Sequence, residues 1–238
     1  IGIISSIGHN ISEFSQSLRK GRSGISFLTQ ADSDKTLWVN IGAEIQDFSY
    51  KEALSKFSDL PRELIDKADH IAHRSPFTIQ TSIISALQAW QHSQLDKKKI
   101  HADRIGLVIA GHNTTTNYQY QLTQKFNNAP EYLSPRYATQ FMDSNQIGIL
   151  SEIFQIQGEG FITGGASASG NIAIIQAIRL IQSGVVDACL VVGVAADLSP
   201  MEIQGFYSIG AMGGKQFHDQ PKLACRPFDQ LHEGFIYG

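Results

Sequence analysis

The chain has 238 residues, of which 42% are hydrophobic and 17% charged, a composition typical of a globular protein that buries a core. Nineteen Lys and Arg residues against 22 Asp and Glu residues give a net charge of −3, and the densest basic run is only residues 97–99. Nucleic-acid binding through phosphates needs longer basic runs, so we expect no nucleic-acid partner. The longest apolar stretch, residues 188–196, is far shorter than the ~20 residues that span a bilayer, so we expect no membrane span.

The cysteine content points to a reducing compartment. Cys189 and Cys225 are the only cysteines in the sequence, and two such residues make neither a disulfide framework nor a metal site. No secretory signal is recognised at the start of the chain. We therefore expect a cytoplasmic protein with no bound metal.

The first elements in chain order alternate between strand and helix. Residues 1–4 predict a short buried strand, and Asn10 followed by Glu13 predicts the capping box of a helix that Gly21 ends. Further along, Ser75-Pro76 predicts the N-cap and first residue of another helix. The apolar residues of that helix recur three or four positions apart: Phe77, Ile79, Ile83, Leu87 and Trp90.

The middle of the chain repeats this alternation. Ile105–Ala110 is a continuous apolar run before Gly111, typical of a strand buried on both faces. A helix, a strand, a helix and a strand follow: residues 144–155, 160–163, 169–183 and 185–194. The helix at 169–183 places Ile172, Ile175 and Leu180 on its predicted apolar face. The alternation predicts an α/β layered fold with a largely parallel sheet, and the polar segment 113–140 predicts an exposed or pocket-lining excursion.

The segment most informative about chemistry is 160–171, which runs from a strand through a turn of small residues into a helix. Such a turn leaves backbone N–H groups unpaired at the positive end of the helix dipole, where they can bind an oxyanion. Small neighbours let a substrate carbonyl approach the backbone closely. The same Gly and Ser residues also form ordinary turns and caps, so spacing alone leaves both interpretations open.

The residues of this turn also come close to a hydrolase motif. Residues 165–169 match the G-x-S-x-G nucleophile elbow except at the last position. A serine hydrolase would also need an acid and a histidine downstream. The candidates show no recognisable arrangement: Asp187, Asp197, Asp219, His218 and His232.

Several motifs together resemble the N-terminal half of a β-ketoacyl synthase of the thiolase-like superfamily. They are residues 8–10, 21–25, 104–109, 179–187 and the Arg226-Pro227-Phe228-Asp229 signature with Gly234, Phe235 and Gly238. The resemblance implies a layered α-β-α-β-α sandwich, of which residues 1–238 are the N-terminal ketosynthase-like domain and the first half of the duplicated fold. It also implies that two catalytic histidines and a lysine lie in the other half. We expect Arg226 and Asp229 to form a structural turn or ion pair, and His112 to line the pocket or cap a helix.

One departure from the family decides the expected activity. The family's Ala-Cys-x-Ser-Gly motif is similar to residues 166–170, which place Ser167 at the position of the nucleophilic cysteine. A thiol has a pKa near 8.5, which falls further at a helix N-terminus, whereas a serine hydroxyl is not appreciably ionised near neutral pH. The helix dipole contributes only about 0.3–1 kcal/mol in exposed settings, so acyl loading onto Ser167 should be crippled.

Decarboxylation does not need the sulfur, because in the family two histidines and oxyanion donors perform it. The chain therefore resembles the ketosynthase-like decarboxylases of polyketide pathways, which turn malonyl-carrier protein into acetyl-carrier protein. The resemblance implies that Ser167 supplies its backbone N–H, and that Gly165, Ala166, Ala168 and Phe206 contact the substrate. It implies no cofactor of the protein's own, because the phosphopantetheine arm of an acyl carrier protein delivers the substrate.

The same family resemblance implies a homodimer. The strand at Gly160–Thr163 is expected to pair with its copy across the two-fold axis, and residues 135–143 are expected near the partner's pocket. Two other activities within the superfamily stay open. One is a non-catalytic subunit like a chain-length factor, in which glutamine usually replaces the cysteine. The other is a condensing synthase whose cysteine was engineered to serine.

Overall fold

The computed structural model of the chain describes residues 1–29 and 37–238. These residues form two compact units. The first unit comprises Ile1–Gly2 and Ser49–Asp197, and the second comprises Ile3–Phe48 and Leu198–Gly238. Within the described part of the chain, no helix combines the length and the apolar character that crossing a membrane requires.

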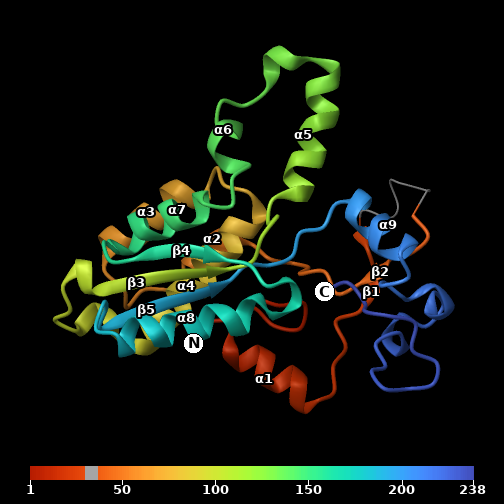
Figure 1. Ribbon diagram of the computed structural model, residues 1–238, viewed down its shortest axis with the longest axis horizontal. Helices are drawn as coiled ribbons and strands as arrows, with labels where there is room; N and C mark the ends of the chain where they lie inside the picture. Colours follow the sequence, from red (N-terminus) through yellow and green to blue (C-terminus); the bar gives the residue numbers. More distant parts are fainter. Residues whose placement is uncertain (30–36) are drawn as a thin grey trace. The chain divides into compact units, whose positions relative to one another are not determined.

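A three-stranded parallel sheet lies at the centre of the first unit (Figure 1). Strand β3 (Ile105–Ala110) lies between β4 (Gly160–Thr163) and β5 (Ala188–Gly193). All six residues of β3 are buried, as the continuous apolar run predicts. In the register, Ala110 is opposite both Thr163 and Gly193, so the carboxyl ends of the three strands meet at one edge.

Helices cover both faces of this sheet. Helix α8 (Ser169–Gln182) lies on one face, where Ala173 and Ala177 pack with Val108 and Ala110 in one buried cluster. Side chains alternate along a strand, so the neighbouring residues of β3 point to the opposite face. Helices α4 (Phe77–Ser93) and α7 (Asn145–Phe154) contact the sheet and pack on each other, with the rings of Trp90 and Phe154 4.8 Å apart.

The buried face of α8 differs from the predicted one. Ala173 and Ala177 face the sheet because their small side chains let the helix approach β3 closely, and Ile175, predicted for this face, is half-exposed. The large apolar side chains of α8 with about half of their surface exposed are Ile174, Ile175, Ile178 and Ile181.

Helix α4 confirms the predicted periodicity, although its start differs. Ile79, Ile83, Leu87 and Trp90 are buried, as expected, whereas Phe77, predicted for the same face, is 37% exposed. The helix begins at Phe77, with Pro76 as the N-cap residue, and Ser75 does not cap it. The Ser75 hydroxyl instead donates to the carbonyl oxygen of Ile71 at 2.8 Å.

Two predicted strands have different bounds or are absent. Residues 1–4 form no strand, because Gly2 packs against α4 so closely that a Cβ there would lie 1.9 Å from the Ser85 carbonyl oxygen. Strand β5 begins at Ala188 and not at residue 185. The reason is that the Arg104 guanidinium binds the carbonyl oxygens of Gly184 and Val185, both at 2.8 Å, and holds them in the preceding turn.

The polar segment 113–140 is largely exposed, as predicted, but much of it is helical. Helix α5 (Thr116–Asn128) and the short helix α6 (Tyr137–Gln140) extend away from the sheet in Figure 1. The rings of Tyr118, Tyr137 and Phe141 stack in series between them. The remaining helices of the first unit are α2 (Tyr50–Leu54) and α3 (Arg62–Ala72).

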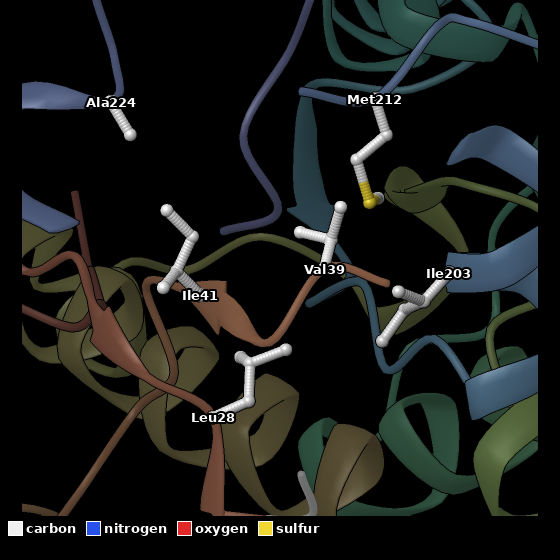
Figure 2. Packing of buried hydrophobic residues seen from close by; sticks show 6 residues of the cluster. All are labelled: Leu28, Val39, Ile41, Ile203, Met212 and Ala224. Atoms are coloured by element: carbon white, nitrogen blue, oxygen red, sulfur yellow. The ribbon is translucent and has the colours of Figure 1, made fainter. Parts of the chain in front are cut away.

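The second unit contains helix α1 (Ile11–Arg19), the antiparallel strands β1 (Ser26–Phe27) and β2 (Ile41–Gly42), and helix α9 (Pro200–Ser208). Asn10 caps α1, its Oδ1 accepting from the Glu13 N–H at 3.0 Å, and Gly21 follows the helix with a φ of +60°. Figure 2 shows six buried residues of this unit: Leu28, Val39, Ile41, Ile203, Met212 and Ala224.

Short 3-10 helices connect several of these elements. They are η2 (Leu95–Lys97), η3 (Ala102–Arg104), η4 (Pro130–Tyr132), η5 (Ala166–Ala168), η6 (Lys215–Phe217) and η7 (Pro221–Leu223).

Candidate functional site

The carboxyl edge of the sheet is the candidate site, because ligands of open α/β sheets bind outside the carboxyl ends of the strands. Gly111 and His112 follow β3, the turn of residues 164–169 follows β4, and residues 194–197 follow β5. The predicted residues Gly165, Ala166, Ser167 and Ala168 therefore lie together at this edge. We call residues 164–169 the Ser167 turn.

The hydroxyl of Ser169 holds the Ser167 turn together. It accepts from the Gly165 N–H at 2.9 Å and donates to the Ala166 carbonyl oxygen at 2.7 Å. Ser169 is buried and begins α8. Between these two contacts, Ala166 has a φ of +48°, in the left-handed region that costs a residue with a Cβ about 1–2 kcal/mol. The turn is thus a strained conformation stabilised by a buried hydroxyl.

Ser167 lies on η5, directly before α8, with its side chain exposed. Among the described residues, no oxygen accepts from its backbone N–H, and no histidine or carboxylate binds its hydroxyl. An N–H group without an acceptor at a helix start can donate to a negatively charged oxygen of a ligand. The described residues supply no base for the hydroxyl, so within this part of the chain the turn is suited to oxyanion binding and poorly suited to nucleophilic attack.

The imidazole of His112 lies beside this turn. A Cβ on Gly164 would lie 3.0 Å from Nδ1 of His112, which means that the ring contacts the glycine backbone. His112 does not cap α5, because the N-cap residue of that helix is Thr115. Its ring lies next to the turn, and its role in lining a pocket stays a prediction.

Asp143 is a residue of this edge that the sequence analysis did not single out. Its Oδ2 accepts from the Asn113 N–H at 2.7 Å, and its Oδ1 accepts from the N–H and the hydroxyl of Thr114 at 2.9 and 2.8 Å. The carboxylate therefore fixes the loop that carries His112. Local sequence patterns do not reveal this role of Asp143, because its partners lie 29 to 30 residues away in the chain.

Phe206, the remaining predicted substrate contact, lies on α9 in the second unit. Its ring packs edge-on against Phe235 with centroids 5.4 Å apart, and it is partly exposed. The Ser199 capping box fixes the start of this helix. Phe206 as a substrate contact stays a prediction.

The residues considered for a hydrolase have other partners. Asp187 forms a two-point ion pair with Arg104, Nη2 to Oδ1 at 2.7 Å and Nε to Oδ2 at 3.2 Å, and this hydrogen bonding lowers the pKa of Asp187. The Asp197 carboxylate accepts from Asn117 at 2.9 Å. Nδ1 of His218 lies 2.9 Å from Asn40 Oδ1. These contacts give no support to an arrangement of acid, histidine and Ser167.

The Arg-Pro-Phe-Asp signature forms the ion pair that the sequence predicts. Nη2 of Arg226 lies 3.1 Å from Oδ2 of Asp229, and this hydrogen bond lowers the pKa of the Asp229 carboxyl. Nδ1 of His232 lies 2.6 Å from the Asp229 carbonyl oxygen, so His232 belongs to the same turn.

Neither cysteine replaces the missing nucleophile. Cys189 is partly buried in β5, and burial raises the pKa of its thiol to about 11, so almost none is ionised near neutral pH. Cys225 is exposed and precedes the Arg226 turn. In the described part of the chain, no three histidine, cysteine or acidic side chains gather where they could hold a metal ion.

Comparison with known proteins defines the class to which this fold and this turn belong. The model of the β-ketoacyl synthase N-terminal domain matches residues 1–238, so the chain belongs to the β-ketoacyl synthase family. A solved β-ketoacyl synthase from Burkholderia phymatum STM815 has the same fold, with a TM-score of 0.75 and 20% identity over 99% of this chain and 54% of that one. The predicted thiolase-like layered fold is thereby confirmed.

Two relatives are more similar in sequence. The polyketide biosynthesis malonyl-ACP decarboxylase PksF of Bacillus subtilis (strain 168) is 36% identical over 238 residues, which cover 100% of this chain and 54% of that protein. The 3-oxoacyl-[acyl-carrier-protein] synthase 2 of Staphylococcus aureus is 27% identical over 239 residues, covering 100% and 55%. The chain spans about half the length of the relatives it matches.

Proposed function

We propose that the whole protein decarboxylates a malonyl thioester on an acyl carrier protein to the acetyl thioester, in polyketide biosynthesis and without condensation. The observation that carries the proposal is the free backbone N–H of Ser167 directly before α8, with no base at its hydroxyl among the described residues. The family resemblance assigns this residue to the position of the family's cysteine. The 36% identity to a protein named as a malonyl-ACP decarboxylase supports the same activity.

The proposed reaction breaks one carbon–carbon bond. The electron pair of the bond to the carboxylate moves into the thioester enolate as CO2 leaves, and a proton then adds to the α-carbon. The Ser167 N–H donates to the enolate oxygen, where negative charge develops, and such donors are worth most when fixed in advance. The family resemblance implies that two histidines of the whole protein supply the proton and the further oxyanion donors.

Condensation would need a covalent acyl-enzyme, and the described residues give the Ser167 hydroxyl no base that would help it form one. A serine acts as a nucleophile when an adjacent base takes its proton, and no such base contacts Ser167 among the described residues. Gly165, Ala166 and Ala168 have small side chains, which leaves the backbone open to the thioester. Phe206 is proposed as a further substrate contact, and the phosphopantetheine arm carries the substrate, so the protein needs no cofactor of its own.

The proposed assembly is a homodimer in the cytoplasm. Strand β4 is an edge strand of the three-stranded sheet, with β3 as its one neighbour in the described chain. An edge strand presents unpaired backbone groups that can pair with a second copy across a two-fold axis. Residues 135–143 are proposed to lie near the partner's pocket. A monomer in sedimentation of the whole protein would falsify this part of the proposal.

The second candidate is a β-ketoacyl synthase subunit, either condensing or like a chain-length factor. The observation in its favour is the 27% identity to a 3-oxoacyl synthase over the same residues. It predicts either carbon–carbon bond formation or no reaction at all with the malonyl thioester.

The test is incubation of the whole protein with malonyl-carrier protein, followed by intact mass of both proteins. The proposal predicts that the carrier loses the mass of one CO2 while the enzyme mass stays unchanged. Ser167→Ala keeps the backbone N–H and should retain most of the decarboxylation. Acyl-enzyme accumulation on the native protein, or loss of all activity in Ser167→Ala, would contradict the proposed role of Ser167.

A further inference from the structure

We propose that Asp143 is a positioning residue of the candidate site, acting through His112 on the Ser167 turn. The expected change in kcat rests on the proposed function. The effect of Asp143 on the conformation of the Ser167 turn does not. Asp143 touches neither Ser167 nor the turn directly; its contacts are to Asn113 and Thr114.

The carboxylate of Asp143 uses both of its oxygens on one short loop. Oδ2 accepts one bond from the Asn113 N–H, and Oδ1 accepts two from Thr114. A second contact holds the same segments together, because the Thr115 hydroxyl donates to the Phe141 carbonyl oxygen at 3.0 Å. Thr114 and Thr115 are buried, so their bonds are partly shielded from water, whereas the bond from Asn113 is exposed. Hydrogen bonds to a charged acceptor are stronger than neutral ones.

His112 is therefore fixed on both of its sides. On one side, the Gly111 N–H donates to the Thr163 carbonyl oxygen at 3.1 Å, which ties the end of β3 to β4. On the other side, Asp143 anchors Asn113. With both neighbours held, the backbone of His112 is placed so that its exposed imidazole lies next to Gly164, the first residue of the Ser167 turn.

This contact matters because the turn is strained. Ala166, two residues after Gly164, has a φ of +48°, and such conformations persist when the surrounding structure determines them. Asp143 has a second effect on the same edge. It already occupies the N–H donors of Asn113 and Thr114, so these two groups are not available to a substrate oxyanion, whereas the N–H of Ser167 has no acceptor among the described residues.

The test is a double-mutant cycle of Asp143→Asn and His112→Ala, read as kcat and KM for malonyl-carrier protein. The asparagine keeps the shape but turns one acceptor into an NH2 group, which cannot accept the bond from Asn113 or Thr114. We expect kcat to fall about tenfold with little change in KM, and the same substitution to cost less than about twofold when His112 is already alanine.

Glu152→Gln, on the exposed face of α7, is the matched control for loss of one negative charge. It should leave kcat unchanged. Equal losses from Asp143→Asn in both His112 backgrounds would overturn the inference, because they would mean that Asp143 stabilises the fold without acting through His112. An unchanged kcat in Asp143→Asn would overturn it too.

A second readout separates this inference from the proposed function. In a Ser167→Cys variant, the rate of alkylation of the new thiol reports the turn whether or not the protein decarboxylates anything. We expect Asp143→Asn to change that rate when His112 is present. In the His112→Ala background, the rates with and without Asp143→Asn should be equal. If the whole protein shows no decarboxylation but the thiol rates couple as expected, the proposed function fails and the positioning role stands. If the rates do not couple, the positioning role fails.

Discussion

The imidazole of His112 occupies the space that a side chain at position 164 would need. Its Nδ1, Cγ and Cβ lie 3.0, 3.6 and 3.7 Å from the Cβ that Gly164 lacks. His112 follows β3 and Gly164 follows β4, so this contact joins two of the three loops at the carboxyl edge of the sheet. A side chain at position 164 would therefore need the imidazole of His112 to shift by a few tenths of an ångström.

A methyl group at position 164 tests that relationship. Gly164→Ala should push His112 away by a few tenths of an ångström, at a cost of about 1 kcal/mol or less in unfolding free energy, because His112 is exposed and can move. Decarboxylation should fall severalfold, since the displaced ring no longer supports the Ser167 turn. Combining the change with His112→Ala should remove most of its effect on kcat, and a full effect in that background would count against the contact.

Gly165 and Gly170 differ in how much space an added methyl group would find, so they make a matched pair of positions for alanine substitution. A Cβ on Gly165 would lie 2.1 Å from Cδ1 of Ile172, whereas one on Gly170 meets nothing within 4 Å. Gly165→Ala should destabilise the protein by about 1–2 kcal/mol. Gly170→Ala lies in α8 and should be neutral or stabilise it by up to about 1 kcal/mol.

Urea unfolding of both variants measures this difference. Ile172→Val removes the atom in the way, so the double variant with Gly165→Ala should recover most of the loss. Equal stability of the Gly165 and Gly170 variants would show that the backbone of the turn lies elsewhere.

Ser167→Cys tests whether position 167 is where the family keeps its nucleophile. A thiol at the start of α8 lies at the positive end of the helix dipole, which lowers its pKa and favours the thiolate. In the whole protein it should become acylated by an acyl-carrier thioester, and it should be alkylated faster at pH 7 than a thiol elsewhere. Intact mass after exposure to the acyl donor measures the first effect.

Ser183→Cys is the control, because Ser183 lies at the other end of α8, where the dipole disfavours a thiolate. Both variants are made in the Cys225→Ser background, which removes the exposed native thiol. Burial raises the pKa of the Cys189 thiol to about 11, so this thiol should not react at pH 7. If the thiol of Ser167→Cys reacts no faster than the thiol of Ser183→Cys and never becomes acylated, Ser167 is not at the catalytic position.

The Arg104–Asp187 pair should make stability depend on acid pH. The hydrogen bond from Arg104 lowers the pKa of Asp187, so the folded state binds its proton less readily than the unfolded chain does. Stability from this pair is present above the unfolded pKa, near 4, and is lost as the pH falls through the folded value. The urea midpoints of the native protein and of Asp187→Asn should be measured from pH 7 to pH 2.5. The two midpoints should differ most at pH 7 and converge at low pH.

Asp96→Asn controls for the removal of one negative charge, because Asp96 forms no ion pair among the described residues. A gap between native protein and Asp187→Asn that stays constant down to pH 2.5 would be inconsistent with the ion pair.

Local pattern predicts the sheet and its helices well, because burial of β3 and the three-to-four spacing of α4 are properties of contiguous residues. Local pattern fails where contacts with residues distant in the chain determine the bounds of a strand or the buried face of a helix. Residues 1–4 have the composition of a strand, but Gly2 packs on α4. The large isoleucines of α8 face outward because two alanines fit the sheet better. Arg104 shortens the start of β5 through contacts to residues 80 and 81 positions away.

The same distinction applies to the site. The Ser167 turn is found from sequence because its glycines, serines and helix start are adjacent in the chain. Ser169 as the residue that bonds the turn, and Asp143 as the anchor of the His112 loop, depend on contacts that only the folded chain reveals. Phe206 as a substrate contact depends on the family resemblance alone, and its role stays a prediction.

The most direct measurement mixes the whole protein with equal amounts of malonyl-carrier protein and acetyl-carrier protein and follows both carriers by intact mass. The proposed function predicts that the malonyl carrier turns entirely into acetyl carrier and that no longer chain forms, because it gives Ser167 no role as an acyl acceptor. Appearance of the acetoacetyl carrier would show that the native protein condenses, and would contradict the central claim.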